Sequence, residues 1–422
     1  MRQRLIFLAL FLAALPARAL TLAEAESLLV ANNRELQASR RQVESAQAQQ
    51  LIAGARPNAT LSINSSSISK DPGIGGGPLD NKRMDTVFRI DQPFERGDKR
   101  ELRLDAASGL QRAAQNDSLD VLRQQLAILN SAYYDLKQSQ EKLAVLRDTA
   151  QLFAGTFDAA QRRLKAGDLA PADVAKVQVD YERAQNDARG AEADLSRARL
   201  ALAYMIGLER AAAELQATDP WPAAERADPA EVEEAVAKLT DVRPDVQAAQ
   251  ARVEAAEKLR ELARAQRTRD VTIGAQFEHF PSNLPTNSIG IGISVPLFTG
   301  YDFSGDIQKA EVDRYAALDA LSRTRAIASN DLLRAASDLN SAVERLERYE
   351  GSLLGAAGRS AQAAEFAFQR GAISVLEVLD ARRTLRAVQI ESVLARADHA
   401  KALAAWRAAL MPADSLQTKM PK

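Results

Sequence analysis

The chain has 422 residues and a formal net charge of −1, and although 26% of its residues are charged, only 5% are aromatic and none is cysteine. The lack of cysteine excludes disulfides, thiolate metal sites and a lipid-anchored N-terminal cysteine, and the near-neutral charge gives no reason to expect a nucleic-acid partner. The two histidines, His279 and His399, lie far apart in the sequence, so no histidine-based metal site is expected.

Residues 1–19 are predicted to be a secretory signal peptide. They begin with two arginines, continue with an apolar stretch from Leu5 to Leu15 and end in an A-x-A cleavage site at Ala17–Ala19. A membrane anchor is the rival interpretation, but the apolar stretch is far shorter than the roughly 20 residues of a spanning helix. We therefore expect the mature chain to begin at Leu20.

Residues 20–207 are predicted to form a first structural repeat, which opens with helices over residues 21–55. Two strands are predicted next, at about residues 58–68 and 84–93, because apolar and polar side chains alternate there. A glycine-rich loop over residues 70–83 separates the two strands.

A long helical hairpin is predicted to complete this repeat. No proline occurs from Phe94 to Ala170, and Gly167 followed by Pro171 indicates a helix stop and restart, with a tip at about residues 164–173. Apolar residues then recur at alternating spacings of three and four, which predicts a coiled coil. The residues of this seam are Val174, Val177, Tyr181, Ala184, Ala188, Ala191, Leu195, Ala198 and Leu202.

The second half repeats the first after a linker. Residues 208–242 contain several prolines and are predicted to form this linker, or collar. The sequence from Arg243 then matches that from Asn33 at an offset of 210 (243 − 33). The second repeat is predicted to span residues 243–411, with strands at about 270–280 and 287–297 and a hairpin tip at about 368–380. Residues 412–422 are predicted to be a flexible tail.

The four strands allow two interpretations. A small soluble sandwich would pack the apolar faces inward, but an isolated two-stranded hairpin in each half is marginal in water. A membrane barrel would turn the apolar faces to lipid and the polar faces to a lumen. Four strands cannot close a barrel, whereas three copies of the chain supply twelve, and we favour this arrangement because lipid tolerates no open sheet edge.

The chain resembles the TolC-type outer-membrane efflux family over essentially the whole predicted mature sequence. The resemblance is carried by IDQPFERGDKRELR (Ile90–Arg103), by ISVPLFTGYDFSGDIQKA (Ile293–Ala310) and by the tip sequences RLKAGDLAPADV and FQRGAISVLEVLDA. The segment QPFERGDKRELR is similar to the branch of the family that is paired with heavy-metal efflux pumps.

The resemblance implies a mainly helical fold with a β-barrel part. It implies a homotrimer with a twelve-stranded barrel in the outer membrane of a Gram-negative-type cell and a helical tunnel in the periplasm. The trimer would contact outer-membrane lipid, and its tips would dock on a periplasmic membrane-fusion adaptor and, through it, on an inner-membrane pump. No cofactor is implied, and neither the cargo nor the resting state of the tip follows from the sequence.

The resemblance also places a gate at the second tip. The acidic residues that narrow the tunnel in this family correspond to Glu377 and Asp380, which share a helix face at i and i+3. Three chains would bring six carboxylates around one axis, and such a ring attracts cations and resists full ionisation. Glu377 also fits as the third residue of a capping box that begins at Ser374, so both roles stay open for it.

The same resemblance predicts that Gly167 and Gly371 shape tips that serve as docking surfaces. The family's tip lock joins a tyrosine and an arginine to an aspartate. The aspartate corresponds to Asp173, but Phe368 lacks the hydroxyl of the tyrosine and Ile373 lacks the charge of the arginine. The lock cannot form as described, so either the closed state is weaker or other residues, such as Lys176 or Arg370, hold it.

Two other classes of protein remain to be considered. A periplasmic coiled-coil adaptor or a scaffold protein without a barrel would also contain long helices. An adaptor should have one hairpin between glycine-rich lipoyl-like halves, whereas two hairpins are predicted here, and a scaffold would not need the two-faced strands. An enzyme is not expected, because no nucleophile–base pair or metal-ligand cluster is evident in the sequence.

Overall fold

The computed structural model describes residues 18–71, 73–281 and 286–419. The chain divides into two compact units. One, which we call the hairpin unit, comprises Met1–Ala38, Leu119–Arg243 and Ile327–Lys422; the other, the sheet unit, comprises Ser39–Ser118 and Pro244–Ala326. The predicted signal peptide lies outside the described residues except for Arg18 and Ala19.

Within the described ranges, no helix is long and apolar enough to cross a membrane.

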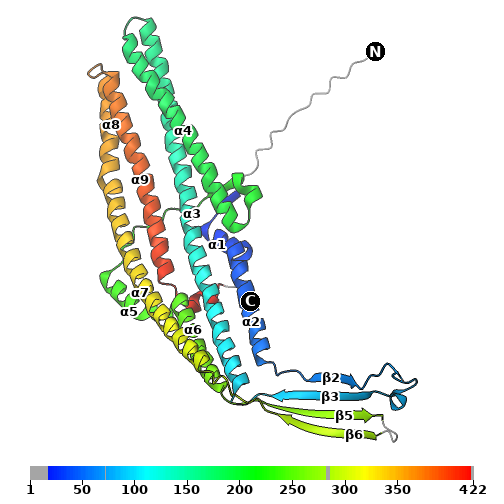
Figure 1. The fold of residues 1–422 in the computed structure, drawn as a ribbon. Coiled ribbons are helices and arrows are strands. Elements are labelled where there is room, and N and C mark those ends of the chain that lie inside the picture. The colour runs from blue at the N-terminus through cyan, green and yellow to red at the C-terminus, as the bar shows by residue number, and fades with distance from the viewer. Residues whose placement is uncertain (1–17, 72, 282–285, 420–422) are drawn as a thin grey trace, which may run out of the picture. The chain divides into compact units, whose positions relative to one another are not determined.

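The sheet unit contains one antiparallel sheet with the strand order β2-β3-β5-β6 (Figure 1). The strands are β2 (Thr60–Ser66), β3 (Asp85–Phe94), β5 (Val271–Phe280) and β6 (Thr286–Ser294). Ile63, Phe88, Phe277 and Ile289 lie in one row across the sheet. The four alternating strands predicted from the sequence are therefore confirmed, and the two halves of the chain each contribute two neighbouring strands.

Two related helices accompany the sheet. Helix α2 (Arg34–Gly54) and helix α6 (Pro244–Ala265) begin 210 residues apart (244 − 34), the offset at which their sequences match. Helix α3 (Lys99–Lys165) is continuous over 67 residues and comes very close to α6. A Cβ atom added at Gly109 of α3 would lie 3.0 Å from the Cβ of Ala255, so the glycine permits this close approach.

The helical hairpins have the predicted arrangement with one difference. Helix α3 returns as α4 (Pro171–Ile206), and α7 (Ser304–Arg348) continues through α8 (Leu354–Gln369) and returns as α9 (Val375–Ala409). The absence of proline from Gly300 to Met411 predicts one uninterrupted helix before the second tip, but a π-helical turn at Tyr349–Leu353 separates α7 from α8. Such a turn inserts an extra residue into the α-helical ladder, and here it contains Gly351.

The coiled-coil seam of α4 is largely buried, as its spacing predicts. Seven of the nine seam residues are buried, whereas Tyr181 and Ala198 are only partly so. Near the tip, Val174, Val177 and Ala184 belong to a hydrophobic core with residues of α3 and α9. Because most seam side chains are small, the helices can approach closely, and the burial of each seam residue stabilises the hairpin by a modest amount.

The linker anchors the first described residues of the chain. Strand β4 (Leu215–Ala217) pairs in parallel with β1 (Arg18–Leu20). The Tyr133 hydroxyl donates to the Leu20 carbonyl oxygen at 3.0 Å and accepts hydrogen bonds from the backbone N–H groups of Thr218 and Asp219. Burial raises the pKa of Tyr133 to about 12, so its hydroxyl keeps the proton that it donates.

The remaining linker elements are short. Two 3₁₀ turns (Glu209–Glu214 and Thr240–Val242) flank helix α5 (Pro229–Leu239), and helix α1 (Leu22–Asn32) packs on α4. The indole ring of Trp221 stacks on Tyr134 with centroids 5.9 Å apart, so Trp221 has a packing role.

The C-terminal segment differs from the flexible tail expected from the sequence. Residues Ala413–Gln417 form helix α10, and the side chain of Leu416 is fully buried in the hydrophobic core of the hairpin unit. The Lys419 ammonium group also pairs with Glu26 at 3.1 Å. The buried Leu416 and the Lys419–Glu26 ion pair hold this segment in place. A helix of five residues is too short to be recognised from the periodicity of its apolar residues.

Candidate functional site

The first hairpin tip is a tight turn closed by backbone hydrogen bonds. Helix α3 ends at Lys165, and Gly167 has a φ of 83°, a conformation that side chains with a Cβ resist. The Asp168 N–H donates to the Arg163 carbonyl oxygen at 2.9 Å, which closes the helix end. Pro171 then occupies the first turn of α4, as predicted.

The second tip repeats this backbone design. Gly371 has a φ of 73°, and the Ala372 N–H donates to the Ala367 carbonyl oxygen at 2.9 Å. The restart at Ser374 also follows the sequence pattern. The Ser374 N–H donates to Glu377 Oε2 at 2.7 Å, and the Glu377 N–H donates to Ser374 Oγ at 3.4 Å. The predicted capping box is confirmed, so the Glu377 carboxylate is engaged as a helix cap.

The carboxylate of Asp380, the second predicted gate residue, does not act as a helix cap. Asp380 is exposed on α9, one turn beyond Glu377. Its backbone carbonyl accepts a hydrogen bond from Thr384, but no described residue contacts its carboxylate as an ion pair or hydrogen-bond donor. Of the two carboxylates, Asp380 is therefore the one available to interact with ions or with other copies of the chain.

The residues that correspond to the family's tip lock are separate. Asp173 pairs with Lys176 on its own helix at 3.3 Å. Phe368 faces the other hairpin, where the Arg163 guanidinium lies 5.9 Å from its ring centroid, and Ile373 is partly buried. Among the described residues, none of these contacts rebuilds the tyrosine–arginine–aspartate lock.

The two substitutes that we considered for the lock do not join the hairpins. Within the described part of the chain, the Lys176 ammonium group forms its ion pair with Asp173 on its own helix, and the Arg370 guanidinium lies 4.3 Å from the ring centroid of Phe366 on its own hairpin. An open cavity of about 390 Å³ lies between the two tips, lined by residues that include Arg163, Leu169, Phe368 and Val378.

A set of contacts that the sequence analysis missed does join the two hairpins. Three arginines at the start of α9 reach the first hairpin, and we call them the arginine latch: Arg382, Arg383 and Arg386. The Arg383 guanidinium pairs with Asp180 and that of Arg386 pairs with Asp187 at 2.7 Å. Only 7% of the Asp180 side chain is exposed, so its charge depends on this partner.

Arg382 completes the latch. Its guanidinium donates to Thr156 Oγ1 at 3.0 Å on the first hairpin and pairs with Glu365 at 2.8 Å on the second. The sequence does contain a signal for the latch, since Asp180 and Asp187 lie seven residues apart on one side of α4. Their partners follow the second tip as R-R-x-x-R, a charge pattern that only a joint comparison of the two hairpins would reveal.

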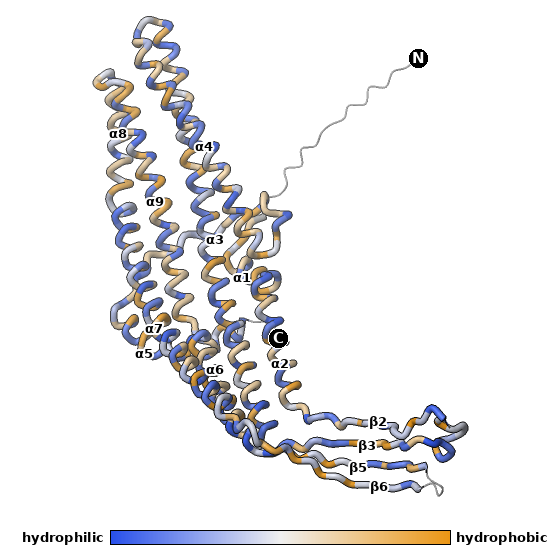
Figure 2. Tube along the Cα trace, viewed as in Figure 1, coloured by the Kyte–Doolittle hydropathy of each residue, from blue (hydrophilic) through white to orange (hydrophobic). Residues whose placement is uncertain are grey.

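Hydrophobic and hydrophilic residues are interspersed along the four strands (Figure 2), and the strand register divides them between two chemically distinct faces of the sheet. Large apolar side chains are exposed on one face, where Ile289 is 83%, Ile291 82% and Ile293 71% exposed. The other face carries Arg89, Asp91 and polar neighbours. The sandwich interpretation required a buried apolar face, so these exposures contradict it.

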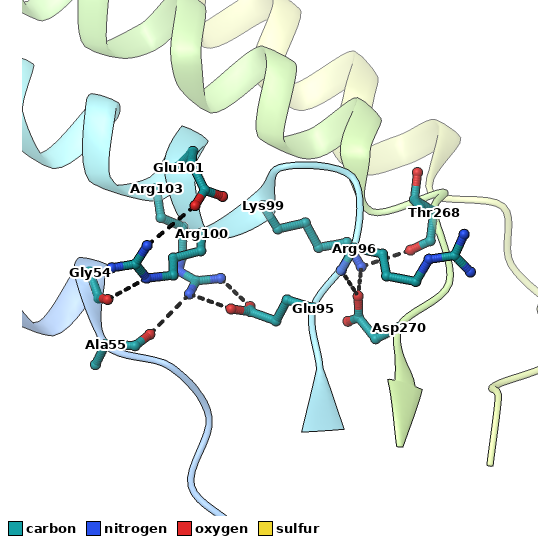
Figure 3. Close-up of polar contacts among 10 residues, drawn as sticks. All are labelled: Gly54, Ala55, Glu95, Arg96, Lys99, Arg100, Glu101, Arg103, Thr268 and Asp270. Carbon is teal, nitrogen blue, oxygen red and sulfur yellow. Dashed lines mark hydrogen bonds and ion pairs between the residues drawn. The ribbon is translucent and has the colours of Figure 1, made fainter. Parts of the chain in front are cut away.

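A dense polar junction fixes the passage from β3 to α3 (Figure 3). The buried Lys99 ammonium group donates to the Thr268 carbonyl oxygen and to Asp270 Oδ1, both at 2.8 Å. The Arg100 Nε donates to the Gly54 carbonyl oxygen at 2.6 Å, and Arg103 pairs with Glu95. The charged residues of the segment QPFERGDKRELR therefore tie the strand, α3 and the ends of α2 and α6 together.

The chain belongs to the outer membrane efflux protein family, whose model matches residues 26–208 and 236–410. It is 26% identical over 373 residues to the cobalt-zinc-cadmium resistance protein CzcC of Cupriavidus metallidurans, covering 87% of this chain and 84% of CzcC. Its fold matches the outer membrane protein VceC of Vibrio cholerae (TM-score 0.74, 20% identity, 93% of this chain and 96% of VceC). It also matches the CmeC outer membrane channel of Campylobacter jejuni (TM-score 0.78, 14% identity, 92% of this chain and 85% of CmeC).

These similarities confirm the predicted fold and class of protein. The chain is an outer membrane efflux channel of the TolC family, with a periplasmic extension, from the Gram-negative type of cell envelope. Channels of this family are trimeric and work within efflux systems, and they are transport proteins rather than enzymes. The adaptor and scaffold alternatives are thereby excluded.

The arginine latch should restrain the second hairpin. Replacing Arg383 and Arg386 with alanine removes two charged hydrogen-bonded pairs, which should favour separation of the hairpins by about 1–2 kcal/mol, or roughly tenfold in the equilibrium. Single-channel recordings of the purified protein in planar bilayers should show a larger conductance. The control Asp173→Ala should change little, since Lys176 on the same helix is its partner; a double variant that conducts like the wild type would show that the latch does not hold the closed state.

Proposed function

We propose that three copies of this chain form the duct of a tripartite efflux system, with the three sheets joined into a twelve-stranded outer-membrane barrel. The observation that carries the proposal is the sheet itself, which has an exposed apolar face and, among the described residues, no strand paired to the outer edges of β2 and β6. In lipid, each unpaired backbone group at such an edge costs several kcal/mol. Pairing β6 of one copy with β2 of the next satisfies both edges at once.

The proposal keeps the domain division expected from the sequence. Removal of residues 1–19 leaves two structural repeats, residues 20–207 and 243–411, joined by a collar at residues 208–242. The tips with Gly167 and Gly371 then form the periplasmic docking surface for a membrane-fusion adaptor, which connects the duct to an inner-membrane pump. Two tips of one backbone design on each chain support this role, because three chains present six similar turns.

The barrel facing is tested by a pair of neighbouring substitutions. Ile291→Arg places a charge on the predicted lipid face and should cost about 2–4 kcal/mol near the membrane midplane, so insertion of the trimer should fail or fall sharply. Gly292→Ser is the matched control on the polar face, where an added Cβ meets only ordinary contacts, at 3.4 Å from Arg89. Heat-dissociable trimer in isolated outer membranes measures both effects. If the serine variant is lost and the arginine variant inserts, the assigned facing is wrong.

We also propose that Asp380 forms the cation-binding gate and that Glu377 acts chiefly as a cap. The exposed, unengaged carboxylate of Asp380 supports the first role, and the capping box supports the second. Asp380→Asn should therefore weaken the block of single channels by divalent cations from the periplasmic side by several-fold, because three converging charges are lost.

Two variants separate charge from cap at the neighbouring position. Glu377→Gln removes the charge and can keep the cap, so it should change cation block less than Asp380→Asn. Ser374→Ala keeps the charge and loses the cap, which should speed amide hydrogen exchange at the start of α9. If Asp380→Asn keeps the full cation block, or if Glu377→Gln alone abolishes it, the gate must be assigned to Glu377 and not to Asp380.

We further propose divalent metal cations as the class of cargo. Two observations support it: the similarity to CzcC over most of both chains, and the acidic residues at the second tip. A host that lacks its own metal-efflux channel should recover growth in zinc, cobalt or cadmium when this chain is expressed with a matching adaptor and pump. Recovery against organic toxicants but not against these metals would point to a different cargo.

A further inference from the structure

A continuous chain of polar side chains crosses the polar face of the sheet. We call it the polar ladder, and it consists of Asp91, Arg89, Gln276, Glu278 and Ser288. The Arg89 Nε donates to both carboxylate oxygens of Asp91, at 3.0 and 2.8 Å, and its Nη1 donates to Gln276 Oε1 at 3.0 Å. The Gln276 amide then donates to Glu278, which also accepts from Ser288 at 3.2 Å.

The ladder lies flat on a floor of two glycines, Gly274 and Gly290. A Cβ atom at Gly274 would lie 2.3 Å from Asp91 Oδ1 and 2.7 Å from Arg89 Nη2, distances that real Cβ atoms do not reach. At Gly290 it would lie 3.0 Å from Gln276 Cγ. The ladder side chains therefore occupy the space of the missing side chains and do not stand up from the sheet.

The charges of the ladder do not cancel. Arg89 pairs with Asp91, whereas Glu278 is held by neutral donors alone, with no cation against it among the described residues. Each chain therefore contributes one net negative charge from the ladder. Because hydrogen bonds fix the Glu278 side chain on the sheet, this charge has a defined position rather than the freedom of an exposed glutamate.

We propose that the polar ladder is a second determinant of ion selectivity, placed in the barrel and independent of the tip. The proposal rests on the trimeric barrel of the proposed function, which brings three copies of the polar face around one lumen. In that setting Glu278 supplies a ring of three charges that attracts cations, and the glycine floor keeps the ladder against the wall so that the charge does not narrow the passage. The ladder suits hydrated cations, which it attracts without binding them tightly.

The charge is tested by Glu278→Gln, which preserves the shape of the side chain: its carbonyl oxygen can still accept from Gln276, and its amide group can donate to Ser288 Oγ. For three charges on the order of 10 Å from the axis, the cation-to-anion permeability ratio should fall about twofold at 0.1 M salt and less at 1 M salt. The measurement is the reversal potential of the purified channel in a potassium chloride gradient. The wild type must first form a heat-dissociable trimer and a channel; failure there would overturn the proposed function. A normal trimer with an unchanged reversal potential would overturn the ladder's role alone.

The floor is tested by the same substitution on the two faces of β5. Gly274→Val should lift Arg89 and Asp91 from the sheet and reduce single-channel conductance, whereas Ala275→Val changes only the exposed apolar face. Conductance unchanged in Gly274→Val would show that the ladder does not depend on the floor. If Gly274→Val yields no trimer, Arg89→Ala decides the question: conductance equal to or above that of the wild type supports a flat ladder, and a reduced conductance contradicts it.

Discussion

The need to pair the backbone groups at the outer edges of β2 and β6 determines the environment and the oligomeric state in which this chain can be stable. In the part of the chain that the structure describes, β2 and β6 are each paired on one side only, and one face of the sheet exposes Ile289, Ile291 and Ile293 of β6. In water, such a sheet would aggregate through its edges and its apolar face. In lipid, exposure of the apolar face is favourable, but backbone groups without hydrogen-bond partners at the sheet edges are too costly. Only a barrel closed with further copies of the chain gives these backbone groups their hydrogen bonds. Assembly and membrane insertion are therefore one physical event in this account.

The two hairpins show how a duplicated backbone can carry different chemistry. Both tips close with a glycine in the left-handed region and a matching backbone hydrogen bond. Beyond the turn they diverge, since α4 starts with proline and presents the aspartates that α9 engages with its arginine latch. A trimer would contain six of these arginine–aspartate pairs, two in each chain, and together they would hold the two hairpins of each chain against each other. None of these pairs requires the tyrosine or arginine that this chain lacks at the positions of the family's tip lock.

The fold could be predicted from the sequence wherever a short period governs burial. Alternation predicted the four strands, spacing of three and four predicted the α4 seam, and the S-x-x-E pattern predicted the cap of α9. Features that depend on two distant segments could not be predicted in this way. Asp180 sits among seam residues as a buried charge because Arg383, over 200 positions later, meets it.

Gly290 of β6 shows the same limit. No short-range pattern around Gly290 shows why a glycine stands there, because the reason lies on the neighbouring strand, where Gln276 fills the space of a side chain. The π-helical turn at Tyr349–Leu353 and the helix around Leu416 were likewise missed, since each depends on local packing rather than on period.

The pairing of β6 of one copy with β2 of the next can be tested directly, because the chain contains no cysteine and introduced cysteines have no native competitors. The measurement is disulfide cross-linking in outer membranes with Ser62→Cys on β2 combined, one at a time, with Ser288→Cys, Gly290→Cys or Gly292→Cys on β6. If β6 of one copy pairs with β2 of the next, at least one of these pairs should yield a covalent trimer on non-reducing gels, which returns to monomer on reduction. Efficient membrane insertion with no cross-linked trimer at any of these registers, or with only a dimer, would contradict it.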